Sequence, residues 1–188
     1  MRIISGTYRS RILGAPPGLA TRPTSDRLRE TLFNVLAPRV VGAAFLDLYA
    51  GSGAVGLEAL SRGATSVTCV ERAPGALKVM RENLANLGVR SGVRVHAGSV
   101  GSFLRKARAG AFDLVFLDPP YDLEGEYETT LELLGAASAG ILADGAVVIA
   151  EHRRKQKLND RHGALKRTRL LEQGDAALSF YAVDGQDG

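Results

Sequence analysis

Cysteine is nearly absent from this sequence, which contains only Cys69 among its 188 residues. An internal disulfide is therefore excluded, and the cytoplasm is the natural setting for such a chain. Long hydrophobic runs are also lacking, because no apolar stretch approaches the ~20 residues that a membrane-spanning helix needs. The opening residues, MRIISGTYRSR, lack the apolar core of a signal peptide. We therefore expect a cytoplasmic protein that does not associate with membranes.

Histidine is scarce as well, with three residues spread over the chain. His96, His152 and His162 form no metal-ligand spacing with one another or with Cys69. We therefore predict that the protein holds no metal. What remains is an ordinary globular composition, with 45% hydrophobic and 23% charged residues. A chain of this length suits one α/β domain with a small appendage.

Positive charge is concentrated in two segments, although the net charge is only +4. Residues 1–39 contain seven arginines and two acidic residues, and residues 151–170 contain eight basic residues and two acidic ones. Between them, residues 40–150 carry more acidic than basic side chains. This asymmetry is typical of a protein that meets a polyanion with both flanks. Two solvated, arginine-rich segments would show the same pattern, so charge alone leaves both interpretations open.

Strands and helices alternate over most of the chain. Continuous apolar strands are predicted at residues 43–49, 65–71, 93–98, 112–118 and 145–152. Helical patterns separate them, and a helix capped by Thr24 or Ser25 and ended by Pro38 precedes them. This alternation predicts a parallel sheet with helices on both faces. Residues 165–172 and 176–183 then read as a closing antiparallel hairpin around the turn QGD.

The first residues of the chain follow a different pattern. Residues 2–14 predict two short strands around Gly6, and a loop rich in proline and glycine follows them. We therefore divide the chain into an N-terminal β-hairpin extension with its loop, residues 1–24, and a main domain, residues 25–188.

A glycine-rich loop follows the first strand of the main domain, in the stretch DLYAGSGAVG. Its glycines fit G-x-G-x-x-G, and Glu71 lies twenty positions after Gly51, at the end of the second strand. Glycine lets the backbone approach a ligand closely, and an acid at that position can accept hydrogen bonds from both ribose hydroxyls of a nucleoside. The motif alone admits an NAD-dependent dehydrogenase. Asp47 argues against it, because a carboxylate there would repel a pyrophosphate and would suit a cationic ligand.

A second motif, Asp118-Pro119-Pro120-Tyr121, ends the fourth strand. Strands one and four are neighbours where the strand order of such a sheet reverses, so Asp118 should face the same crevice as the glycine loop. Asp118 and the Pro119 carbonyl could accept the two hydrogens of an exocyclic amino group, which favours attack by its nitrogen. The prolines fix the backbone, and Tyr121 offers a flat face for a base extruded from its helix. We predict that these four residues are catalytic.

Together these motifs resemble S-adenosylmethionine-dependent methyltransferases of the Rossmann-like class I fold. LDLYAGSGAVGLEAL is similar to their first motif, VERAPGAL to their acidic second-strand motif, and DPPY to the motif of amino-group methyltransferases. The resemblance implies S-adenosylmethionine as the cofactor, with Asp47 near its methionine end and Glu71 on its ribose. The full set of implied cofactor contacts is Asp47, Tyr49, Gly51, Gly53, Glu71, Arg72, Ser99 and Asp118. Ser99 could equally be a plain helix N-cap.

Further stretches narrow the resemblance to one family. RIISGTYRSRIL and RPTSDRLRETLFNVL, with the first motif, are similar to RsmD-type 16S rRNA (guanine-N2)-methyltransferases over about residues 2–151. This resemblance implies a seven-stranded, mostly parallel sheet with a small N-terminal β-hairpin extension. It also implies methylation of one guanine amino group in 16S rRNA within the 30S subunit, by an enzyme that we expect to be a monomer. Two alternatives stay open: a DNA adenine amino-methyltransferase and a non-catalytic rRNA-binding assembly factor.

The arginines of the first segment fit an RNA partner. We predict phosphate contacts from Arg2, Arg9, Arg11, Arg22 and Arg27, with Arg29 as a further candidate. Such contacts would position the protein without reading the RNA sequence. Arg27 and Arg29 could instead pair with Asp26 and Glu30 on the helix surface. For the basic segment 152–170 the sequence indicates no definite role.

Overall fold

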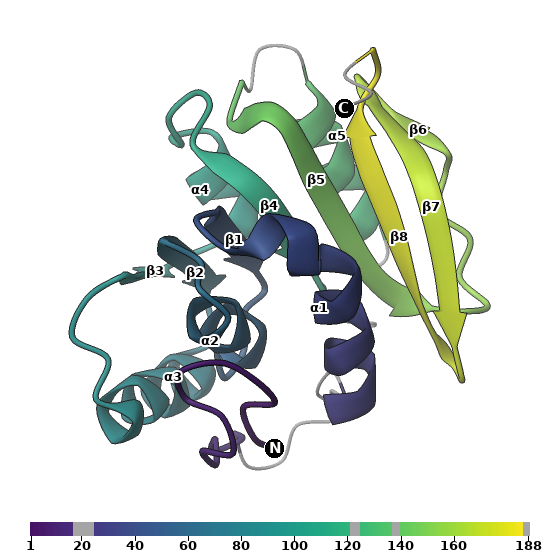
Figure 1. Cartoon of the computed structure of the whole chain (residues 1–188). Helices are drawn as coiled ribbons and strands as arrows, with labels where there is room; N and C mark the ends of the chain where they lie inside the picture. Colours follow the sequence, from purple (N-terminus) through teal and green to yellow (C-terminus); the bar gives the residue numbers. More distant parts are fainter. Residues whose placement is uncertain (17–24, 121–124, 137–139, 186–188) are drawn as a thin grey trace.

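One sheet runs through the computed structural model of the chain, which describes residues 1–16, 25–120, 125–136 and 140–185 (Figure 1). Its strands follow one another in the order β3-β2-β1-β4-β5-β8-β7-β6. Their bounds are β1 Ala44–Leu48, β2 Ser66–Glu71, β3 Val93–Ala97, β4 Phe112–Leu117, β5 Leu142–Arg153, β6 Arg161–His162, β7 Leu165–Gln173 and β8 Ala176–Val183. Pairing is parallel from β3 across to β5 and antiparallel from β5 to β6. The predicted mostly parallel sheet and its closing antiparallel hairpin are confirmed.

Among the described residues the sheet has eight strands rather than the seven expected. The additional strand, β6, is only two residues long and pairs with β7 through Arg161 opposite Lys166 and His162 opposite Leu165. It lies at the edge of the sheet, beyond the predicted hairpin. A two-residue strand has no alternation of apolar and polar positions that a sequence pattern could reveal.

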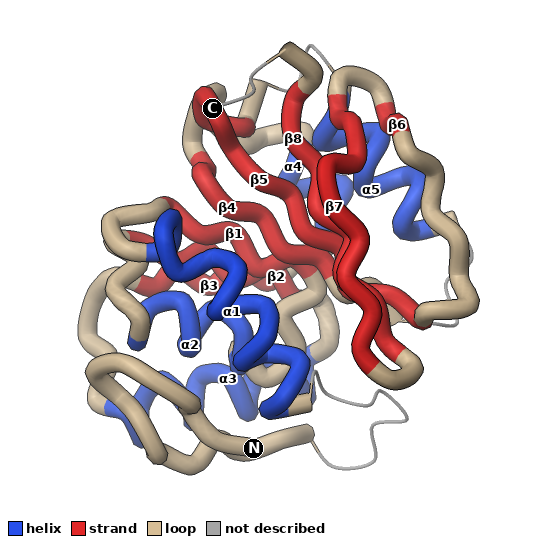
Figure 2. The backbone as a smooth tube through the Cα atoms, turned by 45° about the vertical axis from the view of Figure 1, so that its right-hand side comes forward, coloured by secondary structure: helices blue, strands red, loops and turns tan. Residues whose placement is uncertain are grey.

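Helices cover both faces of the sheet, as Figure 2 shows. Their bounds are α1 Asp26–Val40, α2 Ala54–Ser61, α3 Pro74–Leu87, α4 Val100–Leu104 and α5 Glu126–Gly135. Phe45 of β1 belongs to the apolar core beneath α1, α2 and α3. Leu46 and Leu48 belong to the second core, beneath α4 and α5. Because β1 alternates between two buried faces, its sequence is apolar almost throughout.

The order of the strands reverses next to β1. The chain passes from β1 to β2 and β3 on one side and then crosses to β4 on the other side of β1. Asp47 pairs with Phe116, and Leu48 pairs with Leu117, so β1 and β4 end level with each other. In open α/β sheets, ligands bind beyond the carboxyl ends of the strands at such a switch point.

Helix α1 begins as predicted and ends later than predicted. Ser25 is its N-cap, and its hydroxyl accepts a hydrogen bond from the Leu28 backbone N–H at 3.1 Å. Pro38 lies inside the last turn, and the helix continues to Val40. The prediction that Pro38 ends the helix was therefore wrong. So close to the C-terminus, a proline removes a single backbone donor, and the packing of buried Val40 outweighs that loss.

The predicted pairing over residues 2–14 is present but short. Ile3 donates to the Arg11 carbonyl at 2.9 Å, Ser10 to the Ile3 carbonyl at 2.9 Å and Leu13 to the Met1 carbonyl at 3.0 Å, around one antiparallel bridge between Arg2 and Ile12. The backbone N–H groups of Ile4 and Ser5 instead donate to the buried Glu58 carboxylate of α2, at 2.8 and 3.1 Å. Those donors would otherwise have to find partners on another strand. The division between residues 1–24 and 25–188 falls beside residues 17–24, which lie outside the described residues.

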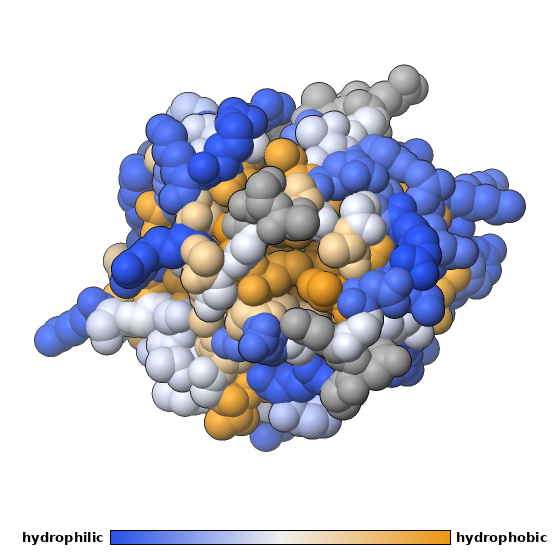
Figure 3. Space-filling model, turned by 90° about the horizontal axis from the view of Figure 1, so that it is seen from above, coloured by the Kyte–Doolittle hydropathy of each residue, from blue (hydrophilic) through white to orange (hydrophobic). Residues whose placement is uncertain are grey.

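The surface is mixed in character. Seen from above, one face has hydrophilic side chains around its rim and apolar ones toward its centre (Figure 3). Within the described ranges, every helix is too short or too polar to cross a bilayer.

Candidate active site

A cavity of about 540 Å³ opens at the carboxyl ends of β1, β2 and β4. It is lined by the end of β1 with the glycine loop, the end of β2 and the end of β4, and also by parts of the N-terminal segment, the start of α4 and the start of α5. Most of the predicted site residues therefore meet there, namely Asp47, Tyr49, Gly51, Glu71, Arg72, Ser99, Asp118, Pro119 and Pro120. Tyr121 lies outside the described residues. Gly53 does not line the cavity and instead approaches Met80 of α3.

The glycine loop has backbone angles that ordinary residues rarely adopt. Gly51 has a φ of 56°, in the left-handed region, and no other atom lies within 4 Å of the place where a Cβ would stand. At Gly56 the constraint is space, because a Cβ there would lie 2.9 Å from Cys69 Sγ and from Val67 Cγ1 of β2. Gly51 therefore forms the turn, and Gly56 lets α2 pack directly against the sheet.

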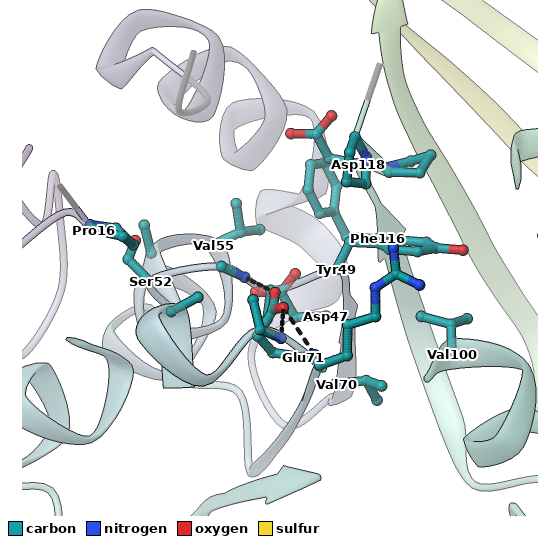
Figure 4. A pocket seen from close by; sticks show the side chains of 18 of the residues that line it. Pro16, Asp47, Tyr49, Ser52, Val55, Val70, Glu71, Val100, Phe116 and Asp118 are labelled. Carbon is teal, nitrogen blue, oxygen red and sulfur yellow. Dashed lines mark hydrogen bonds between the residues drawn. The ribbon is translucent and has the colours of Figure 1, made fainter. Parts of the chain in front are cut away.

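Glu71 organises the backbone around the cavity. One carboxylate oxygen accepts the N–H of Gly51 at 2.8 Å, and the other accepts those of Arg72 and Ala73 at 2.8 and 2.7 Å. Figure 4 shows these bonds, with Asp47 beside Glu71. The carboxylate thus ties the end of β2 to the glycine loop while lining the cavity. Two carboxylate oxygens offer about four acceptor positions and three are occupied, so one position remains for a ligand hydroxyl.

Asp47 is a buried carboxyl group, 2% exposed, at the end of β1. Its Oδ2 accepts the N–H of Gly56 at 2.9 Å. Burial raises the pKa of Asp47 from 3.8 to about 7, against the effect of that hydrogen bond, and the nearby charge of Glu71 raises it further. A carboxyl group in this state favours a positively charged ligand, because a cation would stabilise its ionised form.

Asp118 lies one residue beyond β4, at the opposite wall of the cavity from Glu71. Burial raises the pKa of Asp118 well above 3.8, and the charges of Glu151 and Asp47 raise it further. The cavity therefore holds an excess of carboxyl groups. Such a site suits a cationic ligand and a reaction in which positive charge develops. Within the described ranges, no group of three or more metal-ligating side chains is placed to hold a metal ion.

Two further predicted residues line the cavity and are also bonded within the protein. The hydroxyl of Tyr49 donates to Glu126 Oε1 at 2.7 Å and lies 2.6 Å from Thr130 Oγ1 of α5. Burial raises the pKa of the Tyr49 hydroxyl. Ser99 is the N-cap of α4, since its hydroxyl accepts the N–H of Ser102 at 3.3 Å. The tyrosine thus presents its ring to a ligand, and the serine has the capping role that the sequence left open.

The predicted RNA-contact arginines differ in their exposure. Arg2, Arg9 and Arg27 are exposed, and the exposed Arg11 donates to the Asn86 carbonyl at 2.6 Å. Arg22 lies outside the described residues.

Arg29 is the exception among these arginines, because it is fully buried. Its guanidinium pairs with Asp26 at 2.9 Å, approaches Glu58 at 3.7 Å and bonds the carbonyl of Arg2. The proposed phosphate contact of Arg29 is therefore wrong. Its charge instead anchors the N-terminal segment to α1 and α2.

Asn83 is a residue of the site that sequence reasoning missed. It is 1% exposed on α3, and its Nδ2 donates to the carbonyl of Ser52 in the glycine loop at 3.0 Å. The same side chain forms two hydrogen bonds with Gly14. Its Oδ1 accepts the Gly14 N–H at 2.7 Å, and its Nδ2 donates to the Gly14 carbonyl at 3.1 Å. Ala15 and Pro16, which follow Gly14, line the cavity. A polar residue on the apolar face of a predicted helix was the available signal.

The comparisons with known proteins agree with this geometry. The sequence profile of a family described as Conserved hypothetical protein 95 matches residues 1–182. Ribosomal RNA small subunit methyltransferase D of Escherichia coli is 44% identical over 151 residues, which are 80% of this chain and 74% of that protein. The Bacillus subtilis protein YlbH is 35% identical over 98% of this chain and 100% of its own length.

Solved structures show the same relationship. The Escherichia coli protein yhhF superimposes with a TM-score of 0.85 at 40% identity, covering 99% of each chain. The Haemophilus influenzae protein HI0767 gives a TM-score of 0.79 at 31% identity, covering 96% of each chain. The similarity thus extends over the whole described fold, including the strands that follow residue 151.

Proposed function

We propose that this chain, which belongs to the RsmD family of ribosomal RNA methyltransferases, methylates the exocyclic N2 amino group of guanine 966 in 16S rRNA. The substrate is the RNA within the 30S subunit, and the enzyme acts in the cytoplasm as a monomer. The observation that carries the proposal is the meeting of Asp118 and Glu71 in one cavity, because this places an amine-orienting group beside a nucleoside-binding one.

The residues of the cavity fit S-adenosylmethionine. Its sulfonium and ammonium groups match the excess of carboxyl groups, and it has no phosphate to be repelled by Asp47. Glu71 holds a ribose hydroxyl with its remaining acceptor position, and the glycine loop leaves room for close approach. When bound, the cofactor supplies an electrophilic methyl group.

The role of Asp118 follows from the chemistry of the guanine amine. The nitrogen lone pair is delocalised into the ring, so the amine is a weak nucleophile. The Asp118 carboxylate and the Pro119 carbonyl accept hydrogen bonds from the two N–H groups of the amine. These bonds favour a pyramidal nitrogen and stabilise the positive charge that develops on it. Pro119 and Pro120 hold that carbonyl in place, because each ring fixes φ. Tyr121 stacks on the extruded base.

One experiment tests the substrate. Radiolabelled S-adenosylmethionine is offered with unmethylated 30S subunits, protein-free 16S rRNA and DNA, and the label is located by nuclease digestion and mass spectrometry. We expect label at N2 of one guanine in 16S rRNA of the 30S subunit. Label on adenine in DNA would replace this proposal with a DNA methyltransferase. Absence of cofactor binding by calorimetry would favour a non-catalytic assembly factor.

Cofactor affinity should rise with pH through the titration of Asp47. Because its pKa is raised from 3.8 to about 7, the empty protein keeps this group partly protonated at neutral pH. The cationic cofactor favours the carboxylate, so binding should release a proton. The dissociation constant of S-adenosylmethionine should therefore fall by about fivefold between about pH 6 and pH 7, by about tenfold in all by about pH 8, and level off above. Calorimetry in buffers of different ionisation enthalpy measures both quantities.

The variant Asp47→Asn is the control for this titration. Its affinity should be weaker and nearly independent of pH over the same interval. A slope that survives in Asp47→Asn would assign the titration to another group, such as Asp118.

The same raised pKa of Asp47 has an opposite effect on the empty protein, whose stability should decline as the pH rises from 3.8 toward 7. The reason is that the unfolded chain loses this proton first.

Loss of Asn83 should weaken both the fold and the cofactor site. Asn83→Ala leaves the carbonyl of Ser52 and both backbone groups of Gly14 without their partner. We expect a loss of about 2–3 kcal/mol in unfolding free energy, as for buried polar groups left unsatisfied. Cofactor affinity should fall as well, because Ser52 belongs to the glycine loop. Chemical denaturation and calorimetry measure the two effects.

Asn86→Ala is the matched control, on the same helix. Asn86 is exposed, and its known partner Arg11 bonds the backbone carbonyl, which the substitution keeps. Its stability and cofactor affinity should therefore stay close to those of the unmodified protein. Equal cofactor affinity in the two variants would show that Asn83 does not position the loop.

A further inference from the structure

The turn that follows β5 emerges at the edge of the sheet where the cavity opens. Leu117 of β4 pairs with Ala150 of β5, and continuing that register places Asp118 level with Glu151. Arg153 ends β5 two residues further on, about 7 Å along the strand at the usual rise of ~3.3 Å per residue. In Figure 1 the arrowhead of β5 points toward the lower end of the molecule, where the N-terminal segment also lies.

This turn, residues 153–157, is strongly basic, and we call it the basic turn. Four of its five side chains are cationic, namely Arg153, Arg154, Lys155 and Lys157, and all five residues are exposed. The exposed acids Glu172 and Asp175 lie beside the turn and offset part of its charge, whereas two other acids nearby are bonded elsewhere. Asp160 pairs with Arg167, and Glu128 accepts a hydrogen bond from Asn159. The turn therefore presents a local excess of positive charge to solvent.

The backbone of the basic turn is well anchored. The N–H of Arg154 donates to the carbonyl of Asp175 at 2.8 Å, and that of Gln156 donates to the carbonyl of Arg153 at 2.9 Å. On either side lie buried residues, with His152 bonded to the Ser179 hydroxyl at 2.9 Å and Leu158 in the core. A cluster held in place before binding loses less conformational freedom when a ligand arrives.

The other cations of the segment from 151 to 170 have different positions and partners. Arg161 pairs with Asp184 at 2.7 Å, and Arg167 pairs with Asp160. Arg169 lies over the ring of Phe180, 5.9 Å from its centroid. Lys166 stands at the beginning of β7, at the amino edge of the sheet, away from the cavity. The basic segment therefore divides into a structural part within the sheet and an outward-facing part at the active-site edge.

We infer that the basic turn binds backbone phosphates of the RNA next to the methylated base, as a second contact region across the cavity from the N-terminal arginines. The inference rests on the function proposed above and deepens it. Lysine and arginine bind phosphates without reading the sequence, and they displace the counterions that surround the RNA. Contacts on both sides of the cavity would hold the RNA while one base enters it.

The test compares two triple variants with equal changes in charge. The turn variant is Arg154→Gln/Lys155→Gln/Lys157→Gln. The matched control is Lys106→Gln/Arg108→Gln/Lys166→Gln, three exposed cations at the amino edge of the sheet. Binding of each labelled protein to unmethylated 30S subunits is measured over a series of salt concentrations. Cofactor affinity, measured by calorimetry, should be the same in all three proteins.

The turn variant should bind the subunits about 10–100-fold more weakly near ~0.1 M salt. Its plot of log affinity against log salt should be shallower by about two, since each lost phosphate contact removes ~0.7–0.9 from the slope. The control should match the unmodified protein in both measures. Equal binding by the two variants would overturn the inference. Tight, salt-dependent binding by the unmodified protein without methyl transfer would overturn the proposed function and leave the contact region standing.

Discussion

Replacing Asp118 with asparagine is expected to lower kcat for methyl transfer by about 10²–10³-fold, the usual loss when one charge-stabilising group is removed from an active site. The asparagine amide keeps one acceptor oxygen, but it lacks the negative charge that balances the developing positive nitrogen. Its NH₂ group could also face the hydrogens of the guanine amine. The cofactor dissociation constant should change little, because the role proposed for Asp118 is to orient the guanine amine, while Glu71 is the residue proposed to bind the cofactor.

Thermal stability provides the control for this variant. The pKa of Asp118 is raised by burial and by the charges of Glu151 and Asp47, so its ionised form is unfavourable in the empty protein. Asp118→Asn removes that charge and should raise Tm, more at alkaline pH than at acidic pH. A variant that is inactive, stable and able to bind cofactor identifies a chemical role. Full activity in Asp118→Asn would exclude Asp118 from the reaction.

Replacing Glu71 with glutamine is expected to raise the dissociation constant of S-adenosylmethionine about 100-fold, as measured by calorimetry. One hydrogen bond from a ribose hydroxyl to a charged acceptor accounts for a loss of this size, because ~1.5–3 kcal/mol corresponds to about 10–150-fold in the dissociation constant. The substitution also places an NH₂ group against backbone N–H groups of Gly51, Arg72 and Ala73. At saturating cofactor, kcat should recover in large part, because the contact proposed for Glu71 is with the cofactor and not with the amine.

Glu82→Gln is the matched substitution, since Glu82 is an exposed acid on α3. It should leave cofactor affinity unchanged. Equal affinity in the two variants would contradict a ribose contact by Glu71. A variant Glu71→Gln with normal affinity and low kcat would move Glu71 from cofactor binding to the reaction itself.

The centre of the fold was predictable because its signals are local and strong. The strands around Phe45 and Leu114 are apolar on both faces, and the glycine loop stands at the junction of a strand and a helix. The convergence of Asp47, Glu71 and Asp118 then followed from strand order alone. Because parallel strands end at one edge of the sheet, the predicted strand order is enough to assign residues far apart in the chain to one cavity.

The failed predictions concern residues whose partners lie far away in the sequence. Arg29 has the surface pattern of a charged helix residue, yet Glu58 on another helix makes its burial favourable. Residues 2–14 have the composition of two short strands, but their pairing is limited to the first and last few residues, and the N–H groups of Ile4, Ser5 and Tyr8 bond to Glu58 and Ser61. Sequence patterns indicate periodicity and local propensity. They do not indicate which buried side chain will form hydrogen bonds with a distant segment of the chain.

The anchoring of the N-terminal segment has a consequence for the order of folding. Its backbone is bonded to side chains that come 53, 54 and 69 positions later, in α2 and α3. These acceptors reach their final places only after the helices have packed on the sheet, so the segment docks late, and contacts at such separations form slowly. The amide protons of Ile4, Ser5 and Gly14 should therefore exchange with solvent together, in one opening event that leaves the sheet intact.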